Sequence, residues 1–586
     1  MKDTKQNLDA QDSPQKINNF QNKSKYENLI KASSPWKSMM NICLPSILIM
    51  IVAASYNVID KFLAIDFAAD DVSVKFAAAL VDPNMTAENL INLSTQFAGN
   101  IVQLNFAFTI MIGAGTSILF SIKYGSIDKP GMSKTVNNGF ATAFLISIVL
   151  GLFMWLMVSP ATNYFLLNIQ ANTNEQTPET TAALNELSYQ YASVACLMLP
   201  FSFLSNVFVY VYRSEGKIPL VSIILFSSIG TNVIFAVIFI KYCHLMLTGA
   251  MLATGLSWVT MTLIGFIYSM ISKNTYLKFN LYNLLHIDFK YCKDIISLGL
   301  TALVNNLSIV FLSVLLTILL GDLDVSNNNL QVLYGAIAPW TFFLTAPASG
   351  IYQGSSVLLG YSYGANRMSR YKELMKIVYI FEIIWFITAS LLVLCFGGYM
   401  IGIFGDHFTS DPNHRWLIVL NYSTFAFAGI SYSLITYMRN IKRPGISTLG
   451  SSFRAFIVPF VLSLIGYWVT SATNNQYAFF AIYGLSEFFG LIGVYLLFRK
   501  ELNLYRNYHH DIDINNPDAF VQFEVVRMNA MIEKLKAKKE KKRLSDEKKK
   551  RIDIKIQDCE KIIYTKKLEK AAFVKRALEE QKINTL

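Results

Sequence analysis

The chain has 586 residues, of which 53% are hydrophobic and only 15% charged, with a net charge of +12. Soluble domains carry about a quarter charged residues, and a single soluble core does not bury this much apolar surface without splitting into domains. The composition therefore excludes a single soluble domain and indicates a polytopic membrane protein.

The polar N-terminal end differs sharply from the apolar part of the chain. Residues 1–34 are rich in Asn, Gln, Lys and Ser and are expected to form a disordered cytoplasmic N-terminus. A helix needs roughly 20 apolar residues to cross the hydrocarbon core. A scan with that window predicts twelve membrane-spanning helices, near 36–64, 98–122, 136–158, 188–212, 219–241, 248–271, 293–320, 333–362, 373–402, 415–437, 448–470 and 477–498.

The charge-dense segment 501–586 is expected to be a largely helical cytoplasmic tail. Its basic stretch is EKLKAKKEKKRLSDEKKKR at 533–551, and helical spacing relates Val525, Met528, Ile532 and Leu535. A solvated mixed-charge helix explains the pattern. The alternatives are attraction to anionic inner-leaflet lipid and contact with a protein partner. Specific nucleic-acid binding is not expected, because acidic residues are interspersed and no recognition motif occurs.

Lysine and arginine gather in the predicted loops on one side of the membrane. If the N-terminus is cytoplasmic, the inner loops hold basic clusters such as 367–376 and 439–443, whereas the outer loop at 66–88 is mainly acidic. This bias sets orientation through the positive-inside rule. An even number of spans then leaves both termini cytoplasmic, in a multi-pass protein of the cell membrane.

The two halves of the apolar region repeat one another. GTSILFSIKYG at 115–125 aligns with GSSVLLGYSYG at 354–364, and TGLSWVTMTLIGF at 254–266 aligns with YGLSEFFGLIGVY at 483–495. Each half has six predicted helices, so the repeat is parallel. The prediction is an all-α membrane protein with lobes at 35–272 and 293–500, joined by a cytoplasmic linker at 273–292. Two such lobes are a transporter architecture.

Four segments carry distinctive polar residues, Gly and Pro: LPSILIMIVAASYNVIDKFLAI (44–65), YRSEGKIPLVSIILFSSIGTNVIFAVIFI (212–240), LTGAMLATGLSW (247–258) and GIYQGSSVLLGYSYGANRMSR (350–370). In this order, on a duplicated twelve-helix frame, they resemble the multidrug and toxic compound extrusion (MATE) transporters over about residues 36–500. The resemblance implies two lobes in a V, which alternate between outward and inward openings. It also implies export of small organic cations or drugs against entering H⁺ or Na⁺, with no other cofactor and no enzymatic activity.

The resemblance also assigns residues to a cation-coupling site in the N-terminal lobe. The family's first-helix Asp matches Asp60, with Tyr56 one turn before it, and the fifth-helix Asn and sixth-helix Thr match Asn232 and Thr254. Asp60, Asn232 and Thr254 could supply oxygens to Na⁺. The family's second carboxylate is replaced by Ala236. Other polar residues of the helices are candidates to line the substrate cavity: Asn57, Asn206, Asn305, Asn306, Gln353 and Glu487.

Asp60 has two interpretations. A charge inside a membrane costs about 2.5–3.5 kcal/mol on insertion scales, so an intramembrane carboxylate indicates function by default. The structural alternative places Asp60 near the outer end of its helix, paired with Lys61 or with water. Adjacent helical residues point about 100° apart, which makes the Lys61 pair poor.

The remaining charges in predicted helices include Glu382, Arg454 and Glu487. Arg454 and Glu487 lie on neighbouring predicted helices, which favours an ion pair between them, with a substrate role for Glu487 as the alternative. Glu487 aligns with Trp258, so it is not a duplicated feature.

Three other functions remain as alternatives. A flippase of a lipid-linked saccharide would share the frame, but it needs several basic residues facing the cavity, and the predicted helices offer mainly Lys61 and Arg454. A membrane anchor could act through its basic tail. An enzyme is disfavoured because GxxxxGK[ST], HExxH and GxSxG motifs are missing.

Overall fold

The computed structural model describes residues 34–80, 87–172, 178–272, 275–277, 287–323, 330–402, 414–506, 508, 511–512, 517, 520–540 and 546–585. The side chains of residues 52–62, and of short stretches in a few other helices, also lie outside the description. The expected disorder of residues 1–33 and most of the expected linker at 273–292 fall outside the described residues.

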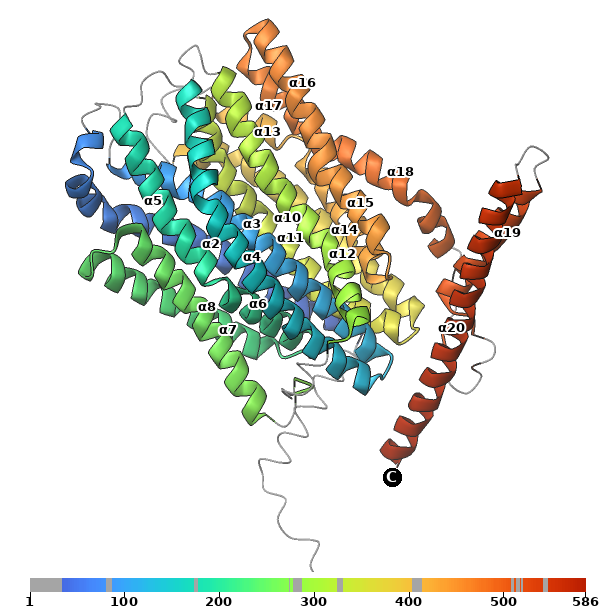
Figure 1. The fold of residues 1–586 in the computed structure, drawn as a ribbon. Coiled ribbons are helices and arrows are strands. Elements are labelled where there is room, and N and C mark those ends of the chain that lie inside the picture. The colour runs from blue at the N-terminus through green and yellow to red at the C-terminus, as the bar shows by residue number, and fades with distance from the viewer. Residues whose placement is uncertain are drawn as a thin grey trace, which may run out of the picture.

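All regular secondary structure in the described part of the chain is helical (Figure 1). This follows from the composition, because inside lipid an apolar segment must satisfy its own backbone hydrogen bonds, and a helix does so within the segment. The first half of the apolar region forms six helical tracks: α2 (Pro35–Lys75), α3 (Ala87–Gly125), α4 (Lys129–Asn172), α5 (Pro178–Leu197) with α6 (Leu199–Ser214), α7 (Ile218–Ala236) with the π-helical turn η2 (Val237–Tyr242), and α8 (Met246–Ile271).

The second half forms six more tracks, which confirms the twelve predicted helices. They are α10 (Phe289–Leu323), α11 (Leu330–Gly364), α12 (Met368–Gly402), α13 (His414–Asn421) with η5 (Phe425–Phe427) and α14 (Ala428–Asn440), α15 (Pro444–Ser452) with η6 (Phe453–Ile457) and α16 (Val458–Thr473), and α17 (Gln476–Gly484) with α18 (Ser486–Arg506). Of the described helices, nine are long and apolar enough to cross a membrane, or ten if α5 and α6 count as one bent span.

One track is sharply bent and two contain a π-helical turn, none of which the sequence scan predicted. The break between α5 and α6 turns the chain by 52°, and Pro200 lies in the first turn of α6. Proline has no N–H to donate and clashes with the preceding turn, which breaks a helix. The π-helical turn η6 is likewise followed by Pro459 at the start of α16. A hydropathy window averages over single prolines, so the scan could not locate these breaks in the helices.

Among the described side chains, the two halves share a buried hydrophobic cluster at one end of the bundle. We call this end, where α3, α11 and α14 terminate, the tail side. There a single buried hydrophobic cluster joins both halves and includes Met39 and Ile42 of α2 together with Leu358 of α11. At the opposite end the described residues form separate clusters, one with Ala68 in the first half and one with Phe386 in the second. The lobes are therefore closed together on the tail side and packed separately on the far side.

Glycines allow the close approach of the lobes on the tail side. We call the contact of α2 and α3 with α10 and α11 the seam. A side chain at Gly115 of α3 would collide with the carbonyl oxygen of Ile295, and one at Gly354 of α11 would meet the backbone of Cys43. Gly115 and Gly354 are equivalent positions of the predicted repeat. The duplication thus places the same backbone-to-backbone contact on both sides of the seam.

The tail forms a helical hairpin of α19 (Phe523–Lys539) and α20 (Asp546–Thr585), which lie side by side outside the bundle (Figure 1). The predicted apolar face is confirmed, because Met528 and Ile532 of α19 pack against Cys559 of α20. This hairpin contacts both lobes on the tail side. Arg576 pairs with Asp128 of the first lobe at 3.3 Å, and Tyr363 of the second lobe donates to Glu524 at 2.6 Å.

Candidate functional site

The packing of α7 against α8 joins two of the predicted coupling residues. Asn232 of α7 is fully buried, and its Nδ2 donates to Thr254 Oγ1 of α8 at 3.0 Å. The oxygen of the same amide, Asn232 Oδ1, is buried and has no hydrogen-bond partner in the described part of the chain. Buried polar atoms almost always have partners. An unpartnered carbonyl oxygen beside a hydroxyl is a suitable pair of ligands for a hard cation or a protonated group.

The other residues predicted for the coupling site lie on α2. The side chains of Tyr56, Asn57 and Asp60 lie outside the described residues, and only the helical backbone that carries them is described. That backbone packs along α7, η2 and α8. One turn beyond position 60, Ala64 joins a buried cluster with Ala236 and Ala250. The fold therefore places the helix segment that carries Asp60 beside the helices of Asn232 and Thr254.

Whether Na⁺ could bind here depends on which oxygen atoms the fold brings together. The unpartnered oxygen of Asn232 and the hydroxyl of Thr254 fit a cation that prefers oxygen ligands. Ala236 is fully buried and contributes only a methyl group where the family usually has a carboxylate. Among the described side chains, no group of three or more His, Cys, Asp or Glu could hold a metal ion. The described side chains of Asn232 and Thr254 therefore offer a cation neutral oxygens only.

The predicted substrate-cavity residues are dispersed. Asn206 Nδ2 donates to the carbonyl of Ser202 at 3.0 Å, and Asn306 Nδ2 donates to the carbonyl of Ala302 at 2.8 Å, so both amides bind their own helices. Asn305 is half-buried. Gln353 lies in the seam, where its Oε1 accepts a hydrogen bond from Arg213 Nη1.

Glu487 forms the predicted ion pair with Arg454. The carboxylate accepts from Arg454 Nε at 2.8 Å and from Nη2 at 2.5 Å. Only 5% of the Arg454 side chain and 20% of the Glu487 side chain are exposed, and the guanidinium lies 3.9 Å from the ring centroid of Tyr432. The pairing prediction is confirmed, and its bidentate geometry is the strong form of this interaction.

Glu487→Gln is expected to destabilise the protein by about 3 kcal/mol, the low end of the range for breaking a buried pair, because the substitution leaves Arg454 without a counter-charge. Thermal unfolding of the purified protein measures the change. Glu186→Gln is the control, because Glu186 pairs with Lys75 at the surface, with side chains 48% and 44% exposed, and exposed pairs contribute under about 1 kcal/mol. Equal losses in the two variants would contradict the expectation.

Sequence reasoning missed two buried arginines. It assigned Arg213 and Arg439 to cytoplasmic loops, whereas the structure leaves only 2% and 1% of these residues exposed. Both directly follow apolar runs, VFVYVY and SLITYM, so extending the predicted spans 188–212 and 415–437 by one and two residues would have included them. It named Glu382 without a role; this residue of α12 is 1% exposed, and neither carboxylate oxygen has a partner in the described residues.

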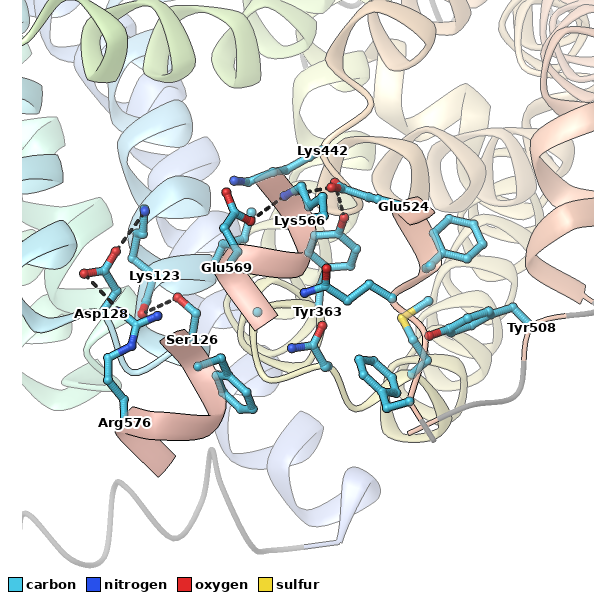
Figure 2. A pocket seen from close by; sticks show the side chains of 18 residues that line it. Lys123, Ser126, Asp128, Tyr363, Lys442, Tyr508, Glu524, Lys566, Glu569 and Arg576 are labelled. Atoms are coloured by element: carbon cyan, nitrogen blue, oxygen red, sulfur yellow. Dashed lines mark hydrogen bonds and ion pairs between the residues drawn. The ribbon is translucent and has the colours of Figure 1, made fainter. Parts of the chain in front are cut away.

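A second polar site lies where the tail meets both lobes (Figure 2). It encloses a cavity of about 130 Å³ whose lining includes Lys123, Lys442, Glu524, Lys566 and Arg576. Burial acts to raise the pKa of Glu524, but Lys566 at 2.7 Å outweighs it and holds this pKa below its usual range. Burial lowers the pKa of Lys442, and the neighbouring Lys566 charge lowers it further. This site is a charge network that attaches the tail to the bundle.

Comparison with known proteins identifies the family. The MatE family profile matches residues 94–238 and 302–472, which is more than half of the chain. An uncharacterized protein of Mycoplasmoides gallisepticum is 22% identical over 80% of this chain and 90% of its own length. The multidrug export protein MepA of Staphylococcus aureus strain N315 is 24% identical over 64% of this chain and 74% of its own length.

Solved structures share the fold. A crystal structure of MATE in complex with MaL6 matches with a TM-score of 0.65 at 17% identity, and covers 82% of this chain and 99% of the solved chain. An outward-facing multidrug resistance MATE family transporter of the MOP superfamily matches with a TM-score of 0.64 at 17% identity, and covers 83% and 99%. With its twelve helices in two lobes and its match to the family profile, this chain belongs to the MatE family of membrane transporters.

Proposed function

We propose that this chain is a secondary active antiporter that exports organic cations or drugs in exchange for H⁺ or Na⁺. The main support is that the two halves pack differently at the two ends of the bundle. They share one buried cluster on the tail side and form separate clusters on the far side. Alternating access needs two bodies that can part at either end. The lobes at 35–272 and 293–500 are the proposed moving bodies, and the multidrug name of the MepA relative supports the substrate class.

The proposed orientation places the tail side in the cytoplasm of the cell, with the protein in the plasma membrane and both termini inside. The bias of lysine and arginine toward loops on that side supports it. The structure described here is then closed toward the cytoplasm. On α19, Lys534, Lys536 and Lys538 are exposed, which supports a contact of the tail with anionic inner-leaflet lipid or with a protein partner.

The proposed coupling site consists of Asp60, Tyr56, Asn232 and Thr254. Its support is the contact of Asn232 with Thr254, the unpartnered amide oxygen, and the packing of α2 beside both helices. H⁺ would be carried by the Asp60 carboxyl group, with the neutral oxygens accepting its hydrogen bond. Na⁺ would use the same oxygens as ligands.

Purified protein in liposomes, a cationic fluorescent dye and an imposed H⁺ or Na⁺ gradient test this proposal. We expect dye movement to follow one of the gradients and to cease when an ionophore collapses it, because a secondary transporter has no other energy source. Protein-free liposomes are the control for leak. Dye movement that ignores both gradients would refute the antiporter.

A further inference from the structure

Two buried arginines from opposite lobes contact the same helix, α11, beside the seam. Arg213 is the penultimate residue of α6 in the first lobe, and Arg439 is the penultimate residue of α14 in the second. Side chains of a helix lean toward its N-terminus, so at these positions both point back into the bundle. Only 2% of Arg213 and 1% of Arg439 are exposed.

Both guanidinium groups contact a single stretch of α11. Arg213 Nη1 donates to Gln353 Oε1. Arg439 Nη2 donates to Ser356 Oγ at 3.1 Å, and its guanidinium carbon lies 3.6 Å from the ring centroid of Tyr352. Tyr352, Gln353 and Ser356 span little more than one helical turn. The two positive charges therefore occupy one small region between the lobes.

Neither arginine has a counter-charge in the described part of the chain. No ion pair involves them, and Arg213 Nε, Arg439 Nε and Arg439 Nη1 are buried without an acceptor. The contrast with Arg454 is informative, because that buried arginine has the bidentate carboxylate of Glu487. Glu382, the other buried carboxylate discussed above, forms no ion pair with either seam arginine.

An uncompensated buried charge costs several kcal/mol, and a guanidinium group cannot avoid this cost by losing its proton. Its planar fork of N–H donors matches the oxygens of phosphate and carboxylate groups. Two such forks, with three buried nitrogen atoms that have no acceptor among the described residues, form a donor set for an oxyanion. Gln353 and Ser356 supply only neutral acceptors while the lobes are closed.

We propose that Arg213 and Arg439 form a binding site for an oxyanion, of the phosphate or carboxylate class, which enters the seam when the lobes part on the tail side. The entry step rests on the alternating access proposed above. The oxyanion would come either from a soluble molecule or from a lipid head group. A phosphate site in this position is also the feature that the alternative function, a flippase, requires and that the sequence did not reveal.

The test uses the full chain in phosphatidylcholine nanodiscs and the thermal unfolding midpoint as readout. In one arm, inorganic pyrophosphate is added, and sodium chloride at equal ionic strength is the control. In the other arm, phosphatidylglycerol is included in the nanodisc. We expect wild-type protein to be stabilised in at least one arm. Stabilisation by pyrophosphate identifies a soluble oxyanion as sufficient, and stabilisation by phosphatidylglycerol alone identifies the lipid source.

The Arg213→Gln/Arg439→Gln variant should lose this stabilisation, with affinity weakened roughly tenfold or more for each arginine removed. Without added anion its midpoint should equal or exceed that of the wild type, because the uncompensated charges are gone; a purely structural role predicts a lower midpoint. The matched control is Arg415→Gln/Arg499→Gln, which removes the same charge from exposed positions and should retain the effect.

If the glutamine variant does not fold, Arg213→Lys/Arg439→Lys replaces it, since it keeps both charges and loses the fork, and weakened pyrophosphate binding is expected. Absence of anion stabilisation in the wild type, or its full retention in the variants of Arg213 and Arg439, would overturn the site. Because no gradient or dye is used, this outcome is independent of the transport assay, and a failed transport assay leaves the binding result intact.

Discussion

Asp60→Asn is expected to abolish gradient-driven dye transport, to the level of protein-free liposomes, while the protein still reaches the membrane and unfolds cooperatively. Asparagine keeps the size and most hydrogen bonds of the side chain, but it neither carries a proton nor offers a negative charge to Na⁺. Since Ala236 replaces the second carboxylate of the family, no neighbouring acid is expected to substitute. Reconstituted transport at fixed protein content measures the effect.

The control for Asp60→Asn is Asp66→Asn, which removes an equal charge from an exposed position of the same helix. It should transport like the wild type. If Asp60→Asn also retains gradient-driven transport, Asp60 has no part in coupling. Loss of transport in both variants would point to a general effect of charge on α2 rather than to a specific site.

Gly115→Leu is expected to hold the lobes apart on the tail side and to stop transport. A Cβ at this position would collide with the backbone of Ile295, and a backbone cannot move aside as a flexible side chain can. Overpacking costs typically 1–3 kcal/mol, which changes the ratio of the two conformations by about five- to 150-fold. The change acts only on the tail-side-closed conformation, in which α3 and α10 touch.

Cys43 offers a direct readout of Gly115→Leu. It is fully buried in the seam, where its Sγ lies 3.9 Å from the carbonyl oxygen of Ile351 of the other lobe. In a variant whose other cysteines are replaced, a thiol reagent applied from the tail side should modify Cys43 at least about fivefold faster when Gly115→Leu is also present. Gly99→Leu is the control, because a Cβ at Gly99 of the same helix meets nothing within 4 Å. Unchanged Cys43 reactivity in Gly115→Leu would refute the seam as the moving contact.

Composition and periodicity determined the fold class. Each membrane-spanning helix satisfies its backbone within one apolar segment, so a window along the chain finds it without knowledge of its neighbours. The repeat placed Gly115 and Gly354 at equivalent positions, and the charges on neighbouring helices predicted the Arg454–Glu487 pair. The motifs pointed to Asn232 and Thr254, which the packing of α7 and α8 joined.

Only the tertiary structure decided which polar residues lie between the lobes. Hydropathy placed Arg213 and Arg439 in loops because each stands at the end of an apolar run. In the structure both contact residues of α11 that are more than eighty positions away in sequence. The attachment of the tail to both lobes, through Asp128 and Tyr363, is likewise a contact between distant segments. A local pattern reports how one segment meets lipid or water. Burial in the seam depends on which segments meet each other, and that is set by packing of the whole chain.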